Sequence, residues 1–103
     1  MFAITDRKGF QIKFENGYVI SCQFGTTNYC SRRSYDPERF FEERKMPLVK
    51  SDDCEIAIIK NGDFVTGEIL EQMGLDISND EMVAGWVSAD NVGKIIAYLV
   101  ELE

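Results

Sequence analysis

The feature that most constrains the fold is an asparagine–glycine pair between two stretches of alternating polarity. Apolar side chains take every second position over residues 10–15, and residues 18–24 alternate in the same way. A period of two places the apolar side chains of a strand on one face. Asn16-Gly17 between such stretches is the strongest short signal for a β-hairpin, because a type I′ turn needs positive φ at both central residues. The sequence therefore predicts a hairpin over Phe10 to Phe24.

Apolar and alternating stretches elsewhere in the chain predict the remaining strands and turns. Strands are expected at residues 2–5, 54–60, 64–66 and 82–88, and turns at residues 6–9 and 61–62. The strand at residues 54–60 carries apolar side chains at neighbouring positions, so we expect it at the centre of the sheet, covered on both faces.

A short helix is predicted where Asp36-Pro37 offers an N-cap followed by proline at the first helical position. The helix is expected over residues 37–45. Phe40 and Phe41 are expected to face inward and to hold this helix on the body of the protein.

The C-terminal segment predicts an amphipathic helix. Ser88 is a candidate N-cap, and apolar residues recur at helical spacing at positions 92, 95, 96 and 99. Another short helix is expected at residues 68–73, ended by Gly74. Residues 1–103 are therefore expected to form a single α+β domain: an antiparallel sheet of about four to five strands, with an N-terminal β-hairpin and a C-terminal helix packed on the sheet.

Histidine is absent from the chain. Its absence excludes Ser-His-Asp and Cys-His mechanisms and histidine metal ligands. The glycines build neither a dinucleotide fingerprint nor a P-loop, and no pair of carboxylates forms a recognisable acid/base motif. We therefore expect a protein that is not an enzyme and that holds no cofactor and no metal. A weak carboxylate-based enzyme is one alternative.

The three cysteines are odd in number and form no CxxC pair, which argues against a secreted disulfide framework. Cys22 and Cys54 occupy apolar positions of predicted strands and are expected to be small core residues, whereas Cys30 is expected in a more open loop. The first residues lack a signal peptide, and no stretch approaches the roughly 20 apolar residues that span a bilayer. We expect a cytoplasmic protein with no membrane partner.

The net charge of −7 is unevenly distributed. Residues 1–50 hold nine basic and six acidic residues, whereas residues 51–103 hold two basic and twelve acidic ones. The acidic half is either a well-solvated surface or a mimic of nucleic acid that blocks a nucleic-acid-binding protein. Extended DNA or RNA would be repelled by it, so we expect no direct binding of long nucleic acid.

Residues 25–45 are the region where ligand binding is most expected. The stretch at residues 25–35 has no periodicity and is rich in turn formers, and basic and aromatic residues alternate within and after it. Arginine binds phosphate through two parallel hydrogen bonds, and aromatic faces stack on bases. The predicted ligand-binding residues are Tyr29, Arg32, Arg33 and Tyr35. The alternative is that these arginines pair with the acidic residues of the following helix, namely Asp36, Glu38, Glu42 and Glu43.

Large apolar residues near the C-terminus raise the question of self-association. Trp86, Tyr98 and Met82 exceed what a small core requires. Core packing is one role for the two aromatic residues. A homo-oligomer interface is the other, since small domains gain stability by self-association, and we expect a homo-oligomer.

One part of the chain resembles a known group. The segment from Gly9 to Cys30 resembles the start of small uncharacterised proteins encoded by phages and prophages, through the stretches Gly9-Phe10-Gln11-Ile12-Lys13-Phe14-Glu15-Asn16-Gly17-Tyr18, Gln23-Phe24-Gly25 and Asn28-Tyr29-Cys30. The resemblance implies a short accessory protein acting in a bacterial host, as an inhibitor or sequestering agent aimed at host defence. We therefore expect a non-enzymatic binding protein whose partner is a small anionic or nucleotide ligand or a host protein.

Overall fold

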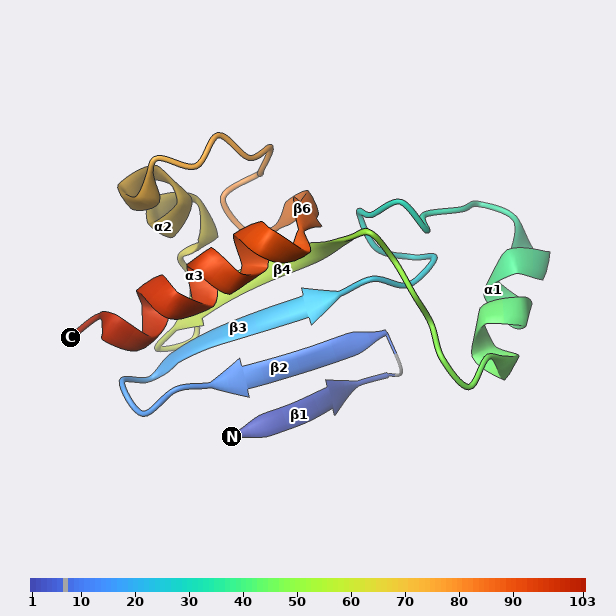
Figure 1. The fold of residues 1–103 in the computed structure, drawn as a ribbon, viewed down its shortest axis with the longest axis horizontal. Helices are drawn as coiled ribbons and strands as arrows, with labels where there is room; N and C mark the ends of the chain where they lie inside the picture. The colour runs from blue at the N-terminus through green and yellow to red at the C-terminus, as the bar shows by residue number, and fades with distance from the viewer. Residues whose placement is uncertain (7) are drawn as a thin grey trace.

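The computed structural model describes residues 1–6 and 8–103. Over these residues the chain forms one six-stranded, mostly antiparallel sheet and three helices (Figure 1). The strands are β1 (Phe2–Thr5), β2 (Gly9–Lys13), β3 (Tyr18–Gln23), β4 (Asp53–Lys60), β5 (Asp63–Phe64) and β6 (Ala84–Ser88). The helices are α1 (Pro37–Lys45), α2 (Thr66–Met73) and α3 (Ala89–Glu101). The predicted α+β class, with its N-terminal hairpin and its C-terminal helix on an antiparallel sheet, is confirmed.

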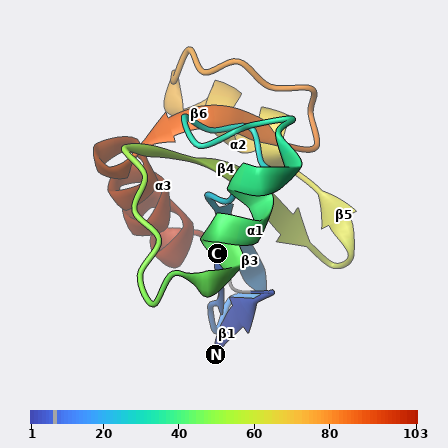
Figure 2. The same cartoon turned by 90° about the vertical axis from the view of Figure 1, so that its right-hand side faces the viewer.

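The strand order makes β4 an interior strand with partners along both of its edges. Strands β1, β2, β3 and β4 follow one another, and β5 and β6 both pair with the other side of β4, at its two ends. Figure 2 shows α3 on one side of the sheet and β5 on the other side of the molecule. The turn predicted at residues 6–9 includes residue 7, which lies outside the described residues.

The predicted hairpin is formed by β2 and β3, in a register that runs from Gly9↔Gln23 to Lys13↔Val19. Its turn differs from the prediction, because Gly17 has a positive φ of 90° and Asn16 does not. The loop therefore spans three residues, the arrangement in which a glycine closes a type I turn. The Asn16 side chain instead donates hydrogen bonds to two carbonyls at the end of α3, so a local turn signal also serves a distant helix end.

The second Asn-Gly pair has the geometry expected of the first. Asn61 and Gly62 have φ values of 53° and 81° and connect β4 to the short strand β5. Both central residues thus adopt the left-handed conformation that a two-residue hairpin turn requires.

One hydrophobic core lies between the sheet and the helices α2 and α3. Its fully buried members come from β3, β4, β6 and both helices: Ile20, Ile56, Ile58, Ile69, Leu70, Ala84, Val87, Ile95 and Leu99. Ser88 caps α3 by accepting a hydrogen bond from the Asn91 N–H, and Gly74 ends α2 with φ at 69°. Both helix boundaries follow their sequence signals.

Helix α1 lies at one end of the molecule, beyond the ends of the strands (Figure 1). Its start is as predicted, because the Asp36 side chain accepts from the Glu38 N–H. The residue that faces inward differs from the prediction, because Phe41 is 58% exposed and the buried residue of α1 is Glu43. The prediction for Phe41 is therefore wrong, whereas Phe40 is half-buried, and the buried residue of the helix is a carboxylate.

Among the described residues, no helix is long and apolar enough to cross a membrane.

Candidate functional site

The loop between β3 and α1, residues 24–36, carries all four predicted ligand-binding residues and is anchored on β4 by two carboxylates. Asp53 accepts hydrogen bonds from the N–H and the hydroxyl of Ser31, each 2.6 Å long. Glu55 accepts from the backbone N–H of Tyr29 at 2.8 Å. The loop is thus tied to β4 at two positions. These two carboxylates of the acidic half already bind the protein's own backbone.

The two neighbouring arginines of the loop point to different partners. The Arg32 Nε donates to the carboxylate of Glu43 at 2.9 Å, and a terminal nitrogen donates to the Lys50 carbonyl at 3.1 Å. Glu43 is buried, so this ion pair connects the loop to α1. For Arg32 the ion-pair alternative is therefore the observed one, and its guanidinium is separated from the other predicted contact residues.

Arg33 lies between two tyrosine rings instead. Its guanidinium carbon is 4.4 Å from the ring centroid of Tyr29 and 5.2 Å from that of Tyr35. It donates to the Thr27 carbonyl and to the Tyr35 hydroxyl, both at 3.3 Å. The hydrogen bond with Tyr35 raises the pKa of Arg33, which keeps its charge. In the described part of the chain no carboxylate lies within 4.0 Å of this guanidinium.

Trp86 joins this group because of a β-bulge. Cys54 pairs with Val87 and Ile56 pairs with Ala84, so one residue of β4 faces two residues of β6. The extra residue lets both Ala84 and Val87 enter the core, and it turns Trp86 outward with a positive φ of 52°. Trp86 is 55% exposed, so core packing, one of the two roles predicted for it, is wrong.

The loop and the bulge are in direct contact. The Trp86 N–H donates to the Tyr29 carbonyl at 2.9 Å, and the two ring centroids are 5.9 Å apart at an interplanar angle of 37°. A Cβ at Gly85 would lie 2.8 Å from the Tyr29 Cβ, so glycine is what allows this close approach. We call Tyr29, Arg33, Tyr35 and Trp86 the aromatic–arginine surface. Its first three members are among the residues predicted from the sequence to bind a ligand. Trp86 was predicted only for core packing or self-association, because strand alternation cannot reveal a bulge.

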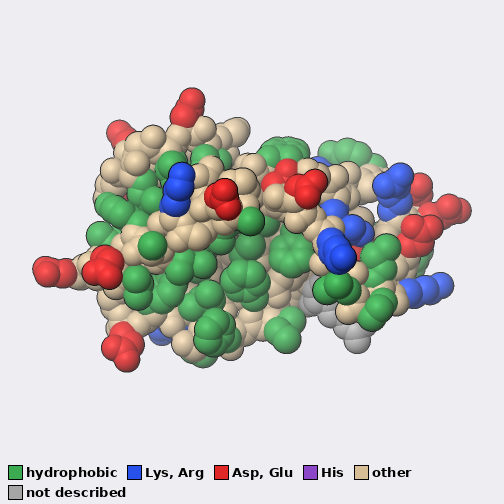
Figure 3. Space-filling view, viewed as in Figure 1, with side chains coloured by type: hydrophobic (Ala, Val, Ile, Leu, Met, Phe, Trp, Pro, Cys, Tyr) green, Lys and Arg blue, Asp and Glu red, His purple; other side chains and the backbone are tan. Residues whose placement is uncertain are grey.

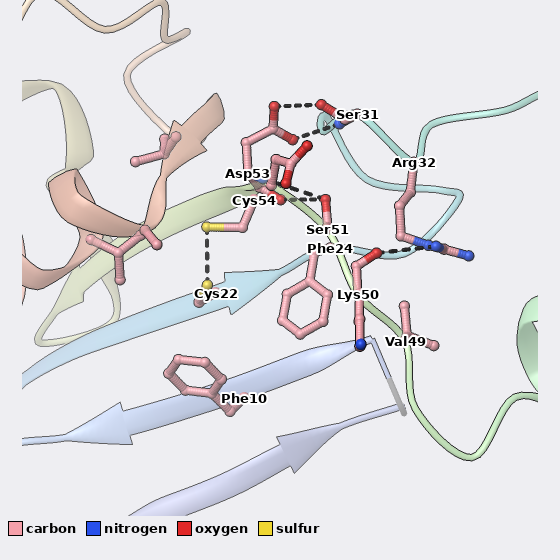
Figure 4. Close-up of a pocket in the computed structure, with 14 residues that line it drawn as sticks. Phe10, Cys22, Phe24, Ser31, Arg32, Val49, Lys50, Ser51, Asp53 and Cys54 are labelled. Carbon is pink, nitrogen blue, oxygen red and sulfur yellow. Dashed lines mark hydrogen bonds between the residues drawn. The ribbon is translucent and has the colours of Figure 1, made fainter.

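A cavity lies beside this loop (Figure 4). It measures about 710 Å³ and is lined by Arg32 of the loop, by Phe10 and Phe24, and by Cys22 and Cys54. Tyr29, Arg33, Tyr35 and Trp86 are not among its lining residues. The loop therefore separates two different features, an exposed aromatic surface and a recessed cavity.

Two of the three thiols meet at this cavity. The Sγ atoms of Cys22 and Cys54 are 3.0 Å apart, and both side chains belong to the core, as predicted. Cys30 is only 1% exposed and its Sγ donates to the Gly25 carbonyl at 3.4 Å, so the expected open position of Cys30 is wrong. Burial raises the pKa of the Cys30 thiol.

Comparisons with protein-family models, with curated proteins and with solved structures find no match to this chain. Within residues 1–6 and 8–103, no group of three or more carboxylates or thiols is arranged to hold a metal ion.

Proposed function

We propose that this chain is a non-enzymatic binding protein and that the aromatic–arginine surface is its contact site for a partner protein. The observation that carries the proposal is the exposed cluster itself, in which Tyr29, Tyr35 and Trp86 are 41%, 88% and 55% exposed. Tryptophan, tyrosine and arginine are the residues that dominate binding energy at protein interfaces.

The surface is also organised before any partner arrives. Tyr29 is held by hydrogen bonds to Glu55 and to the Trp86 backbone, and Arg33 is held between two rings. A contact surface that is already ordered loses less conformational entropy on binding. The positive φ of Trp86 supports the same role, since strained backbone in folded proteins concentrates at functional positions.

A partner protein accounts for these features better than a small anion does. Arg32, which would complete a two-arginine anion site, is bound to Glu43, and only Arg33 remains at the surface. The remaining N–H groups of Arg33 suit a carboxylate or carbonyl of the partner, and the three rings suit apolar contact. The resemblance of residues 9–30 to phage and prophage proteins makes a host protein in the bacterial cytoplasm the expected partner. Three free thiols fit that reducing compartment.

Replacing Trp86 by alanine is expected to weaken binding of the partner protein about 30-fold, which corresponds to about 2 kcal/mol for a central interface residue. The partner is first isolated as a protein that the wild type retains from bacterial lysate. The dissociation constants of the purified pair are then measured by calorimetry. Phe41→Ala is the control, because Phe41 is an equally exposed aromatic residue outside the surface.

Two results would contradict this proposal. Equal affinity of wild type, Trp86→Ala and Arg33→Ala for the isolated partner would exclude the surface as the contact site. In a parallel thermal-shift screen against nucleotides and cyclic dinucleotides we expect no stabilisation. A ligand present at about 100 times its dissociation constant would stabilise the fold by about 2.7 kcal/mol. If a nucleotide produced such a shift in wild type and not in Trp86→Ala, the surface would be a nucleotide-binding site and the proposed partner protein would be excluded.

We further propose that the chain forms a homodimer through β1. Phe2 and Ile4 are 80% and 85% exposed, and they pair with Ile12 and Phe10 on the face of the sheet that carries the core. Figure 3 shows this apolar face beside α3, over β1, β2 and β3. The outer edge of β1 has no strand partner among the described residues, and residues 2–5 include no charged side chain. An uncharged edge strand can pair antiparallel with its own copy across a two-fold axis.

The Ile4→Lys variant is expected to sediment as a monomer at high micromolar concentration, where wild type sediments as a dimer. A lysine on an edge strand opposes strand pairing because its charge would have to be buried. The Met82→Lys variant is the control, because Met82 is 50% exposed and was also a candidate for self-association from the sequence. A wild-type monomer at that concentration would exclude the dimer. If Met82→Lys were monomeric and Ile4→Lys remained dimeric, the dimer interface would include Met82 and would not involve β1.

A further inference from the structure

Cys22 and Cys54 lie side by side on adjacent strands. Cys22 of β3 is paired with Ile56, and Cys54 precedes Ile56 by two residues on β4, so both side chains project from the same face as diagonal neighbours. Their Sγ atoms are 3.0 Å apart. The S–S bond of a disulfide is about 2.05 Å long, so a movement of about 1 Å would join the two sulfurs.

The cavity gives small molecules a route to this pair. Cys22 and Cys54 are each only 5% exposed, yet both line the cavity of about 710 Å³ (Figure 4). Pockets for small organic ligands measure roughly 300 to 1,000 Å³. The sulfurs lie beside the rings of Phe10 and Phe24, which belong to the same wall. A pair of thiols that served only to fill the core would not need open space beside it.

The two thiols differ in character. The hydrogen bond between the two thiols lowers the pKa of Cys22 and raises the pKa of Cys54. The thiolate is the nucleophile in reactions with disulfides. Cys22 is therefore the expected attacking sulfur and Cys54 the second, resolving sulfur, whereas Cys30 does not line the cavity.

We propose that Cys22 and Cys54 form a thiol–disulfide exchange site for low-molecular-weight disulfides that enter this cavity. The Cys22 thiolate attacks one sulfur of the small disulfide, forms a mixed disulfide and releases the first small thiolate. The Cys54 sulfur, after losing its proton to solvent, then attacks Cys22 Sγ and releases the second. The protein loses two electrons and two protons, and the small disulfide is reduced to two thiols. This site is separate from the aromatic–arginine surface and does not depend on its function.

The experiment exposes the folded, full-length protein to oxidised glutathione or to the neutral bis-hydroxyethyl disulfide, and follows thiols and intact mass. We expect wild type to lose two of its three thiols, and peptide mapping to find Cys22 joined to Cys54. Cys54→Ser should retain one small-molecule adduct on Cys22, because the resolving thiol is absent. Cys22→Ser should form no internal disulfide, because only one sulfur of the pair remains.

Cys30→Ser is the matched control and should react like wild type, since Cys30 is buried elsewhere. Mapping of the wild-type protein tests the proposal even if a variant fails to fold. A link that includes Cys30, or three thiols that stay unreacted in the folded protein, would overturn the proposal. So would a reaction rate that rises with low urea in step with the unfolded fraction, because the thiols would then react only through unfolding.

Discussion

Replacing Thr66 by valine is expected to lower the free energy of unfolding by about 2 to 4 kcal/mol. The Thr66 side chain is fully buried, and its hydroxyl accepts from the Ile58 N–H at 2.8 Å and donates to the Met82 carbonyl at 2.8 Å. Valine keeps the shape of the side chain but leaves the buried Ile58 N–H and the partly buried Met82 carbonyl without this partner. Each buried group that loses its hydrogen bond costs about 1 to 3 kcal/mol.

The matched control is Thr66→Ser, which keeps the hydroxyl and removes one methyl group. Its expected cost is about 1 kcal/mol, the value of one buried carbon. Both variants are measured by urea denaturation followed by circular dichroism. If Thr66→Val were as stable as Thr66→Ser, the hydroxyl would not be what connects β4, the start of α2 and the segment before β6.

The second large effect is expected at Glu43, whose replacement by alanine should lower the free energy of unfolding by about 2 to 3 kcal/mol. The carboxylate of Glu43 accepts from the Thr26 N–H at 3.1 Å and from the Arg32 Nε at 2.9 Å. Hydrogen bonds to charged groups contribute about 1.5 to 3 kcal/mol each. The expected stabilisation from the ion pair between Glu43 and Arg32 is reduced, because the Arg32 side chain is 24% exposed and can be hydrated once Glu43 is removed.

Two further variants separate the contributions at this position. Glu42→Ala, at an exposed position of the same helix, should stay within about 0.5 kcal/mol of wild type. Glu43→Gln keeps an oxygen for Thr26 but loses the charge opposite Arg32, so an intermediate stability is expected. Hydrogen exchange should show that Glu43→Ala opens α1 first. Equal stability of the alanine variants at positions 42 and 43 would mean that α1 is held by other contacts.

The local signals in the sequence predict local structure well. The alternation on both sides of Asn16-Gly17 predicts the β2–β3 hairpin, and Asp36-Pro37 and Ser88 predict the starts of α1 and α3. Each of these signals acts within a few residues, so its physical cause is contained in the stretch that displays it.

The errors arise where the deciding partner is distant in the sequence. Asn16 bonds to carbonyls 83 and 86 residues away, and Glu43 faces inward because its partners are 11 and 17 residues away. Helical periodicity alone favoured Phe40 and Phe41 as the buried side of α1. A buried carboxylate is satisfied only by groups that folding brings together, so no pattern within the helix reveals it.

The candidate site was predictable in part for the same reason. Tyr29, Arg33 and Tyr35 were recognised because residue type and an irregular loop suffice to suggest contact residues. Trp86 was not, because simple alternation assigns it to the same face as Ala84, and one extra residue in β6 reverses that assignment. The proximity of Cys22 to Cys54 depends on strand register, which becomes known only when β3 is seen to pair with β4.

The outward position of Trp86 makes the protein its own optical reporter. Trp86 is the single tryptophan of the chain, so the intrinsic indole fluorescence comes entirely from the proposed contact surface. An indole already in water changes its emission little when the chain unfolds, which makes this signal a poor monitor of denaturation. The same indole should shift to shorter wavelength when a partner covers it. Occupancy of the surface can therefore be followed in the unlabelled protein, separately from its stability.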